Sequence, residues 1–287
     1  MSGRRPSSQY LTNTSAPSGG MAIGRLAAVV STALLSGSAT ALRRKDDSCT
    51  CKNWKQTYAT GAARCGQTNE YFETTKMNAL SNDLVEAAYE YLGPQFCAGF
   101  YEAIDDNACV NVGMKEYRGQ WCYVDASCSN LNGGVSVNDK LSWKLCTDGE
   151  DKMLRNYSPP DLLKLAQDNH LELGLTNKMA YTVGSYRWKY ISAFWEDADI
   201  DYITSAPLAM SLADLKETLR VRWGKRHRDI DPEMKAELQK YVDSGVPVVF
   251  DTAKDQHPPH VVIQGKSVWV AMSGASPNMI CVTGCQH

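Results

Sequence analysis

The sequence predicts an α+β fold class, with a disulfide-rich N-terminal module followed by a small mixed α/β C-terminal module. Hydrophobic residues make up 43% of the 287-residue chain, which is enough for a substantial core. Eight of the ten cysteines lie between positions 49 and 146, and the other two lie close to the C-terminus. Beyond residue 151, helix-like patterns alternate with short runs of β-branched and aromatic residues, which is typical of mixed α and β structure.

Residues 1–41 are predicted to be an N-terminal extension and a signal peptide. A basic residue precedes the apolar run 26–35, and the small residues Ala39-Thr40-Ala41 follow, so cleavage is expected after Ala41. The run is shorter than the roughly 20 apolar residues that cross a bilayer, so no permanent membrane anchor is expected. Residues 1–20 are polar and rich in Ser, Pro and Gly, which leaves Met21 as an alternative start to Met1.

Residues 42–48 are predicted to be a linker that carries both basic and acidic groups. Arg43, Arg44 and Lys45 lie on the flank where positive charge disfavours simple export, and they could instead mark a basic processing site. With the signal peptide before them and the cysteines after them, the expected location is secreted or the endomembrane lumen.

The ten cysteines favour disulfides over a metal site. Their number is even, and all of them follow the expected cleavage point. A structural zinc site usually contains two closely spaced cysteine pairs, whereas Cys49 and Cys51 are too close together and Cys122 and Cys128 too far apart. We therefore expect the following to be half-cystines: Cys49, Cys51, Cys65, Cys97, Cys109, Cys122, Cys128, Cys146, Cys281 and Cys285.

The break in cysteine density predicts two modules. Residues 49–146 form a cysteine-rich, disulfide-stapled module whose eight cysteines pair among themselves, and residues 151–287 form the mixed α/β module. Cys281 and Cys285 are expected to bond to each other or to nearby structure. The formal net charge of −2 gives no general attraction to nucleic acid, so no nucleic-acid partner is expected.

Local patterns predict several elements. In the first module, a helix is expected to begin at Ser81-Asn82-Asp83 and to stop at Gly93-Pro94, and Asn132-Gly133-Gly134 predicts a turn. In the second module, capping patterns predict helices that begin at Ser158, Ser211 and Asp231. The helix from Ser158 is expected to end near Asn169, and the helix from Asp231 is expected to end at Gly245. Strands are expected at 179–183, 186–191, 246–250, 260–263 and 267–270.

Aromatic residues beside two cysteines suggest a ligand-binding surface. Trp121-Cys122-Tyr123 and Trp143-Lys144-Leu145-Cys146 resemble part of the Trp-Cys pattern of kringle and fibronectin type II modules, which bind ligands on aromatic surfaces. Cys128 interrupts the pattern and the other spacings do not match, so membership is not inferred. Trp121 and Tyr123 are candidate ligand-binding residues; the alternative is that such rings pack against disulfides in a small core.

A divalent metal ion is the one cofactor for which the sequence offers ligands. Asp255, His257 and His260 occur close together, and carboxylate and imidazole groups bind zinc and similar ions. Ordinary solvated loop residues are the alternative. The acidic cluster that begins at Glu196 does not match an EF-hand, because Tyr202 stands where that loop needs glycine. No other cofactor is evident.

A cysteine nucleophile is a further hypothesis. Cys65, His260 and Asn278 occur in the chain order of papain-like peptidases, but the residues around Cys65 lack the rest of that signature. Full pairing of ten cysteines also requires Cys65 to be bonded. The common serine, metal and nucleotide motifs are missing from the sequence, so the chain is not assigned as an enzyme and its catalytic residues remain unknown.

The most basic segment lies between residues 220 and 228. It contains five firm cations in nine positions, where a sulfated glycan or an acidic protein surface could bind and where an indole ring is available for stacking. The alternative is that these cations stabilise the C-terminal end of a helix. The candidate ligand-binding residues are Arg220, Arg222, Trp223, Lys225, Arg226 and Arg228.

The predicted function is that of a secreted, disulfide-stapled protein without catalytic activity. It would act as a binding or structural protein of the cell surface or extracellular space and would contact anionic glycan. The alternative is an extracellular hydrolase with an unrecognised Cys/His or His/Asp site.

Overall fold

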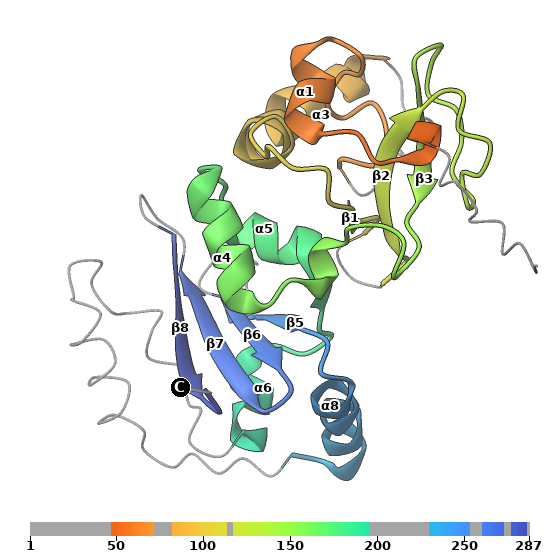
Figure 1. Cartoon of the computed structure of the whole chain (residues 1–287). Coiled ribbons are helices and arrows are strands. Elements are labelled where there is room, and N and C mark those ends of the chain that lie inside the picture. The colour runs from red at the N-terminus through yellow and green to blue at the C-terminus, as the bar shows by residue number, and fades with distance from the viewer. Residues whose placement is uncertain are drawn as a thin grey trace, which may run out of the picture. The chain divides into compact units, whose positions relative to one another are not determined.

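The computed structural model describes residues 47–71, 82–113, 117–195, 230–252, 260–272 and 277–285. These residues form helices and two β-sheets, and the C-terminal part is mostly sheet (Figure 1). The predicted α+β class is therefore confirmed, together with the disulfides of the N-terminal region. The division into modules at 49–146 and 151–287 stays a prediction.

The first sheet is antiparallel and carries an aromatic core. Its strands lie in the order β1 (Val110–Asn111), β2 (Gln120–Asp125) and β3 (Leu141–Leu145). Helix α1 (Trp54–Ala59) begins at Asn53, whose side chain accepts a hydrogen bond from the Gln56 backbone N–H. The ring of Trp54 packs edge-on against Trp121, with 5.0 Å between ring centroids. Burial of such rings supplies much of the energy that holds this part together.

Four disulfides staple the segments around this sheet. The pairs are Cys49–Cys128, Cys51–Cys122, Cys65–Cys97 and Cys109–Cys146. The fifth disulfide joins Cys281 to Cys285, and the chain has no free cysteine. The eight upstream cysteines thus pair among themselves, as expected. Each bond closes a chain loop and so lowers the entropy of the unfolded state.

The α-helix predicted to stop at Gly93-Pro94 does end at Gly93, but a helix of another kind follows it. Helix α3 (Asn82–Gly93) is followed directly by η2 (Pro94–Tyr101), which has π-helical hydrogen bonding. Proline has no backbone N–H to donate, but the first position of a helix does not need one. Pro94 takes that position, and Phe100 and Tyr101 on the same segment are fully buried. Burial of these side chains therefore favours a second helical segment directly after Gly93-Pro94, a residue pair that usually ends a helix.

The second sheet contains five strands in chain order. They are β4 (Thr182–Val183), β5 (Val248–Asp251), β6 (His260–Gln264), β7 (Ser267–Met272) and β8 (Asn278–Thr283). Strand β4 pairs parallel with β5, and the other neighbours are antiparallel. The predicted strands at 246–250, 260–263 and 267–270 correspond to β5, β6 and β7, whereas β8 was not predicted.

Helices cover both faces of the second sheet. Along β5, Val249 packs in the cluster that contains Leu162 and Leu173, whereas Phe250 packs in the cluster that contains Leu238. Successive side chains of a strand point to opposite faces, so these clusters lie on opposite sides. Helices α4 (Pro159–Asp168) and α5 (Leu173–Ala180) contribute to the first cluster, and α6 (Trp188–Ile191) and α8 (Pro232–Ser244) to the second.

Two predicted helices match their capping signals. The Ser158 hydroxyl accepts from the Asp161 backbone N–H at 3.3 Å, and α4 ends before Asn169. The Asp231 carboxylate accepts from the Met234 N–H at 2.9 Å, and Gly245 ends α8 with φ +64°. Short 3-10 turns occur at η1 (Asp47–Cys49), η3 (Leu154–Asn156) and η4 (Ser192–Phe194).

The strand predicted at 179–183 is confirmed at two residues alone, and the strand predicted at 186–191 is wrong. Met179 and Ala180 end helix α5, only Thr182 and Val183 form a strand, and Trp188–Ile191 is helix α6. The β-branched and aromatic composition favours a strand only where side chains alternate between two faces. Here Trp188 and Ile191 are three residues apart and both enter one cluster, which a helical turn allows and a strand does not.

Helix α5 is buried at every residue, so its last carbonyl groups need partners inside the protein. Two side-chain amides from the first sheet provide them. The Asn111 amide donates to the carbonyl oxygens of Lys178 and Tyr181, both at 2.9 Å. The Gln120 amide donates to the Ala180 carbonyl at 3.0 Å and to Asn111 Oδ1 at 2.9 Å. These bonds connect the C-terminal end of α5 to strands β1 and β2.

Gly134 lies where a side chain does not fit, and this gives a first prediction. A Cβ atom at this position would lie 1.9 Å from the backbone oxygen of Trp143. We expect Gly134→Ala to lower the free energy of unfolding by about 2 kcal/mol or more, because one strand segment must move. Gly99→Ala is the control, because a Cβ there would meet its nearest atom at an ordinary 3.5 Å. Equal denaturation midpoints for the two variants would contradict the packing at Gly134.

Some predictions lie outside the described residues. These are the signal peptide, most of the 42–48 linker, the cap at Ser81 and the helix at Ser211. Among the helices that the structure does describe, none has the length and apolar character to cross a membrane.

Candidate functional site

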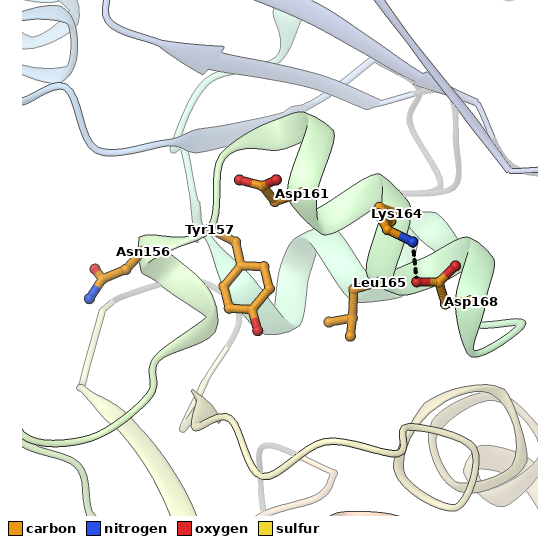
Figure 2. Close-up of a pocket in the computed structure, with 6 residues that line it drawn as sticks. All are labelled: Asn156, Tyr157, Asp161, Lys164, Leu165 and Asp168. Atoms are coloured by element: carbon orange, nitrogen blue, oxygen red, sulfur yellow. Dashed lines mark hydrogen bonds and ion pairs between the residues drawn. The ribbon is translucent and has the colours of Figure 1, made fainter.

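A surface pocket lies beside helix α4. Its volume is about 370 Å³, and it is lined by Asn156, Tyr157, Asp161, Lys164, Leu165 and Asp168. The last four share one face of α4 because they follow helical spacing. Figure 2 shows the Tyr157 ring and the Leu165 side chain pointing into the same space, with polar groups around them. The lining of the pocket therefore combines apolar and polar side chains.

The polar groups of the pocket are held by local bonds. Ser158 Oγ donates to Asp161 Oδ2 at 2.6 Å, which fixes one carboxylate at the start of α4. The Lys164 ammonium bonds Asp168 Oδ2 at 2.6 Å, and Figure 2 marks this pair. The Asn156 amide donates to Asp148 at 2.9 Å. Because the Lys164–Asp168 pair is largely exposed, its contribution to stability is small, and both groups can still bond a ligand.

Two cationic side chains make cation–π contacts with tyrosine rings near this pocket. The Lys152 ammonium lies 5.7 Å from the ring centre of Tyr157 and bonds Asp106 at 2.6 Å. Arg155 lies 3.8 Å from the ring centre of Tyr117. Burial alone would lower the pKa of Lys152, but interactions with Asp106 and Tyr157 together outweigh burial and raise it. Lys152 therefore stays charged, and its contact with the ring helps to orient Tyr157.

A buried charged group lies between α5 and the second sheet. Asp251 on β5 and His260 on β6 are directly opposed, and His260 Nε2 lies 3.4 Å from Asp251 Oδ1. The Lys178 ammonium on α5 forms an ion pair with the same oxygen at 2.9 Å. The side chains of His260 and Lys178 are only 2% and 7% exposed. The sequence pointed to His260 but not to Lys178, because nothing local marks a partner so distant along the chain.

The candidate aromatic platform is not at the surface. Trp121 and Tyr123 are fully buried, which argues against their use as ligand contacts and fits packing in the disulfide core. The Tyr123 hydroxyl instead donates to Glu70 at 2.6 Å, and Tyr58 donates to the same carboxylate at 2.9 Å. Neither Glu70 nor this network had a recognisable pattern in the sequence.

The Glu70 network responds to pH. Burial raises the pKa of Glu70, although hydrogen bonds from Tyr123 and Thr68 oppose the shift. A raised carboxyl pKa means that the folded protein holds the proton more tightly than the unfolded chain does. The contribution of Glu70 to stability is therefore larger at acidic pH and decreases as the pH rises through the folded-state value.

The remaining predicted residues divide into two groups. Cys65 is bonded to Cys97, so it is not a thiol nucleophile in this structure. The following lie outside the described residues: Arg220, Arg222, Trp223, Lys225, Arg226, Arg228, Asp255 and His257. Their roles in ligand or metal binding stay predictions. The α4 pocket itself was missed, although its polar residues at helical spacing after Ser158 were visible in the sequence.

The comparisons with known proteins add no relative. The chain matches no protein-family model, no curated protein and no solved structure.

Proposed function

We propose that this chain is a secreted, noncatalytic binding or structural protein of the cell surface or extracellular space. The observation that carries the proposal is the complete pairing of ten cysteines in five disulfides. Such bonds form and persist in oxidising compartments, and they are compatible with an extracellular or lumenal protein. In this proposal a signal peptide is removed, and the mature chain begins at or just after Leu42.

The geometry of the α4 pocket supports binding more than catalysis. Its carboxylates, its ammonium and its amide can all hydrogen-bond a polar ligand, and Tyr157 and Leu165 offer apolar contact. The disulfide core fixes the segment before the pocket, because Cys109 and Cys146 are bonded and the Leu154 N–H donates to the Cys109 carbonyl at 3.0 Å. A pocket carried on such a rigid support binds without a large ordering cost.

The second part of the proposal is a contact with anionic glycan through the basic segment at 220–228. Its five cations are concentrated in a chain of net charge −2, so a polyanion would be guided to this place. Exposed charge contacts are screened by salt, which makes this binding salt-dependent.

Affinity chromatography on a sulfated polysaccharide tests the glycan contact. We expect the native chain to be retained at low salt. A quadruple variant should elute at a clearly lower salt concentration; it carries Arg222→Ala, Lys225→Ala, Arg226→Ala and Arg228→Ala. The matched control removes four exposed cations elsewhere: Lys55→Ala, Lys140→Ala, Lys235→Ala, Lys240→Ala. Equal elution of the two folded variants, or no retention of the native chain, would contradict the contact.

A second candidate function rests on the His260–Asp251 contact, which is the arrangement that an extracellular His/Asp hydrolase needs. Two features weigh against it: the imidazole is buried, and Lys178 shares the carboxylate. A panel of ester, peptide and glycoside substrates separates the candidates. Hydrolysis by the native chain that disappears in His260→Gln would favour the hydrolase.

A further inference from the structure

Two disulfides of the first sheet lie in contact with each other. Cys51 Sγ is 3.5 Å from Cys109 Sγ and 4.0 Å from Cys146 Sγ, although its bonded partner is Cys122. The four sulfur atoms all lie within 4.8 Å of one another. We call Cys51, Cys109, Cys122 and Cys146 the four-sulfur cluster.

Four separate chain segments bring these sulfur atoms together. Cys51 precedes α1, Cys109 precedes β1, Cys122 lies within β2, and Cys146 follows β3. Backbone bonds fix the segments independently of the disulfides. For example, the Lys52 N–H donates to the Tyr123 carbonyl at 2.8 Å, and the Cys146 N–H donates to the Gln120 carbonyl at 2.8 Å. The positions of the sulfur atoms therefore do not depend on the S–S bonds alone.

The spacing of the cluster suits a tetrahedral metal ion. A zinc–thiolate bond of about 2.3 Å places the sulfur atoms of a tetrahedral site about 3.8 Å apart. The two distances from Cys51 to the other disulfide, 3.5 and 4.0 Å, already lie on either side of this value, and the remaining ones are no longer than 4.8 Å. After reduction, the bonded partners must separate to the same distance, which side-chain rotation allows.

We propose that, when its two disulfides are reduced, the four-sulfur cluster binds one zinc ion. Each disulfide takes up two electrons and two protons from an external dithiol, which is itself oxidised to a disulfide. Zinc then displaces four protons from the thiols, and these protons pass to solvent. Four soft thiolates in tetrahedral arrangement select zinc over hard cations. The inference concerns the reduced chain and does not rest on the proposed function.

The cluster has a cation on its own face of the sheet and a route for a reductant. A zinc ion with four thiolates carries net charge −2, which favours a cation nearby. Lys144 pairs with Cys122 across β2 and β3, so its buried side chain lies on the same face of the sheet, where its ammonium is already ion-paired with Asp151 at 2.9 Å. Cys146 is partly exposed, whereas Cys109 and Cys122 have no exposed surface. A dithiol can therefore attack the cluster first at Cys146.

The Cys65–Cys97 disulfide provides a matched control. Its sulfur atoms lie near one carboxylate, that of Glu102, and this makes a set of three ligands rather than four. Removal of either pair leaves the same number of cysteines in the chain. Only removal of Cys109 and Cys146 breaks the four-sulfur cluster.

Metal titration of the reduced full-length chain tests the proposal. Three proteins are compared: the native chain, the double variant Cys65→Ser/Cys97→Ser, and the double variant Cys109→Ser/Cys146→Ser. Each is reduced with dithiothreitol in the absence of oxygen, desalted and incubated with zinc chloride. After a second desalting, we expect one zinc per chain in the first two proteins and none in the third. We also expect zinc to raise the melting temperature of the reduced native chain, because it binds the folded form.

Cobalt substitution keeps the test decisive if the third protein fails to fold. Cobalt(II) in the reduced native chain should give the intense visible bands of tetrahedral coordination and the charge-transfer absorption of four thiolates. Coordination by fewer than four sulfur atoms would overturn the proposal. The proposal would also be overturned if the native chain retained no zinc. It would equally be overturned if the double variant Cys109→Ser/Cys146→Ser retained as much zinc as the double variant Cys65→Ser/Cys97→Ser.

Discussion

Gln120→Leu should lower the free energy of unfolding by about 3 kcal/mol, because it leaves buried polar groups without partners. The native amide donates to Ala180 and to Asn111, and Gln120 Oε1 accepts from the Arg155 N–H at 3.3 Å. Leucine has a similar size, so the loss reports the hydrogen bonds rather than a cavity. Urea denaturation with the disulfides intact measures the change.

The control for this prediction is Gln56→Leu. Gln56 is an exposed residue of α1, so the same substitution there should change the free energy of unfolding by no more than about 0.5 kcal/mol. If Gln120→Leu unfolds at the same urea concentration as Gln56→Leu, the account of how α5 is held to the first sheet is incorrect.

Lys178→Met should lower the free energy of unfolding by a similar amount, about 3 kcal/mol, for an electrostatic reason. Methionine keeps most of the side-chain volume but removes the ammonium that lies 2.9 Å from Asp251. The carboxylate is then left largely buried beside the imidazole of His260 without its ammonium partner, and an uncompensated buried charge is costly. Thermal and urea denaturation both measure the effect.

A double-mutant cycle separates the ion pair from general packing. Addition of Asp251→Asn to Lys178→Met should cost much less than the sum of the two single substitutions, because the charge that needed a partner is gone. Lys164→Met is the matched control at the exposed pair with Asp168, where the expected loss is below about 1 kcal/mol. Additive losses in the cycle would show that Lys178 and Asp251 do not interact.

Local signals in the sequence predicted the helix ends and turns that depend on neighbouring residues alone. Ser158 and Asp231 cap their helices, Gly245 ends one, and Asn132-Gly133 turns the chain with positive φ at both residues, 48° and 94°. Each of these features depends on one side chain and its own neighbouring backbone groups. Cysteine density likewise predicted that the eight upstream cysteines pair among themselves, although two of these bonds join cysteines that are 71 and 79 residues apart.

Features with distant causes were not predictable. The helix at 188–191 depends on a cluster with Phe250, and Pro94 continues a helical path because Phe100 and Tyr101 are buried. Lys178 and Asp251 meet across α5 and β5, with no signal in either segment.

The sequence alone also did not decide whether the aromatic residues of the first sheet are buried or exposed. A tryptophan beside a cysteine is found both in cores and on binding surfaces, and only the contacts of Trp121 with Trp54 distinguish the two. The α4 pocket was likewise hidden, because the position of Tyr157 relative to Leu165 depends on the turn at η3 that precedes α4.

The central proposal is export of a chain whose cysteines are all paired within their own regions. Nonreducing peptide mapping of protein recovered from the medium of exporting cells tests it most directly. The expected map has five disulfide-linked peptides with the pairs Cys49–Cys128, Cys51–Cys122, Cys65–Cys97, Cys109–Cys146 and Cys281–Cys285, and a first peptide that begins at or just after Leu42. A free thiol, a bond from Cys281 or Cys285 into residues 49–146, or an intact chain that retains residues 22–41 would contradict the claim.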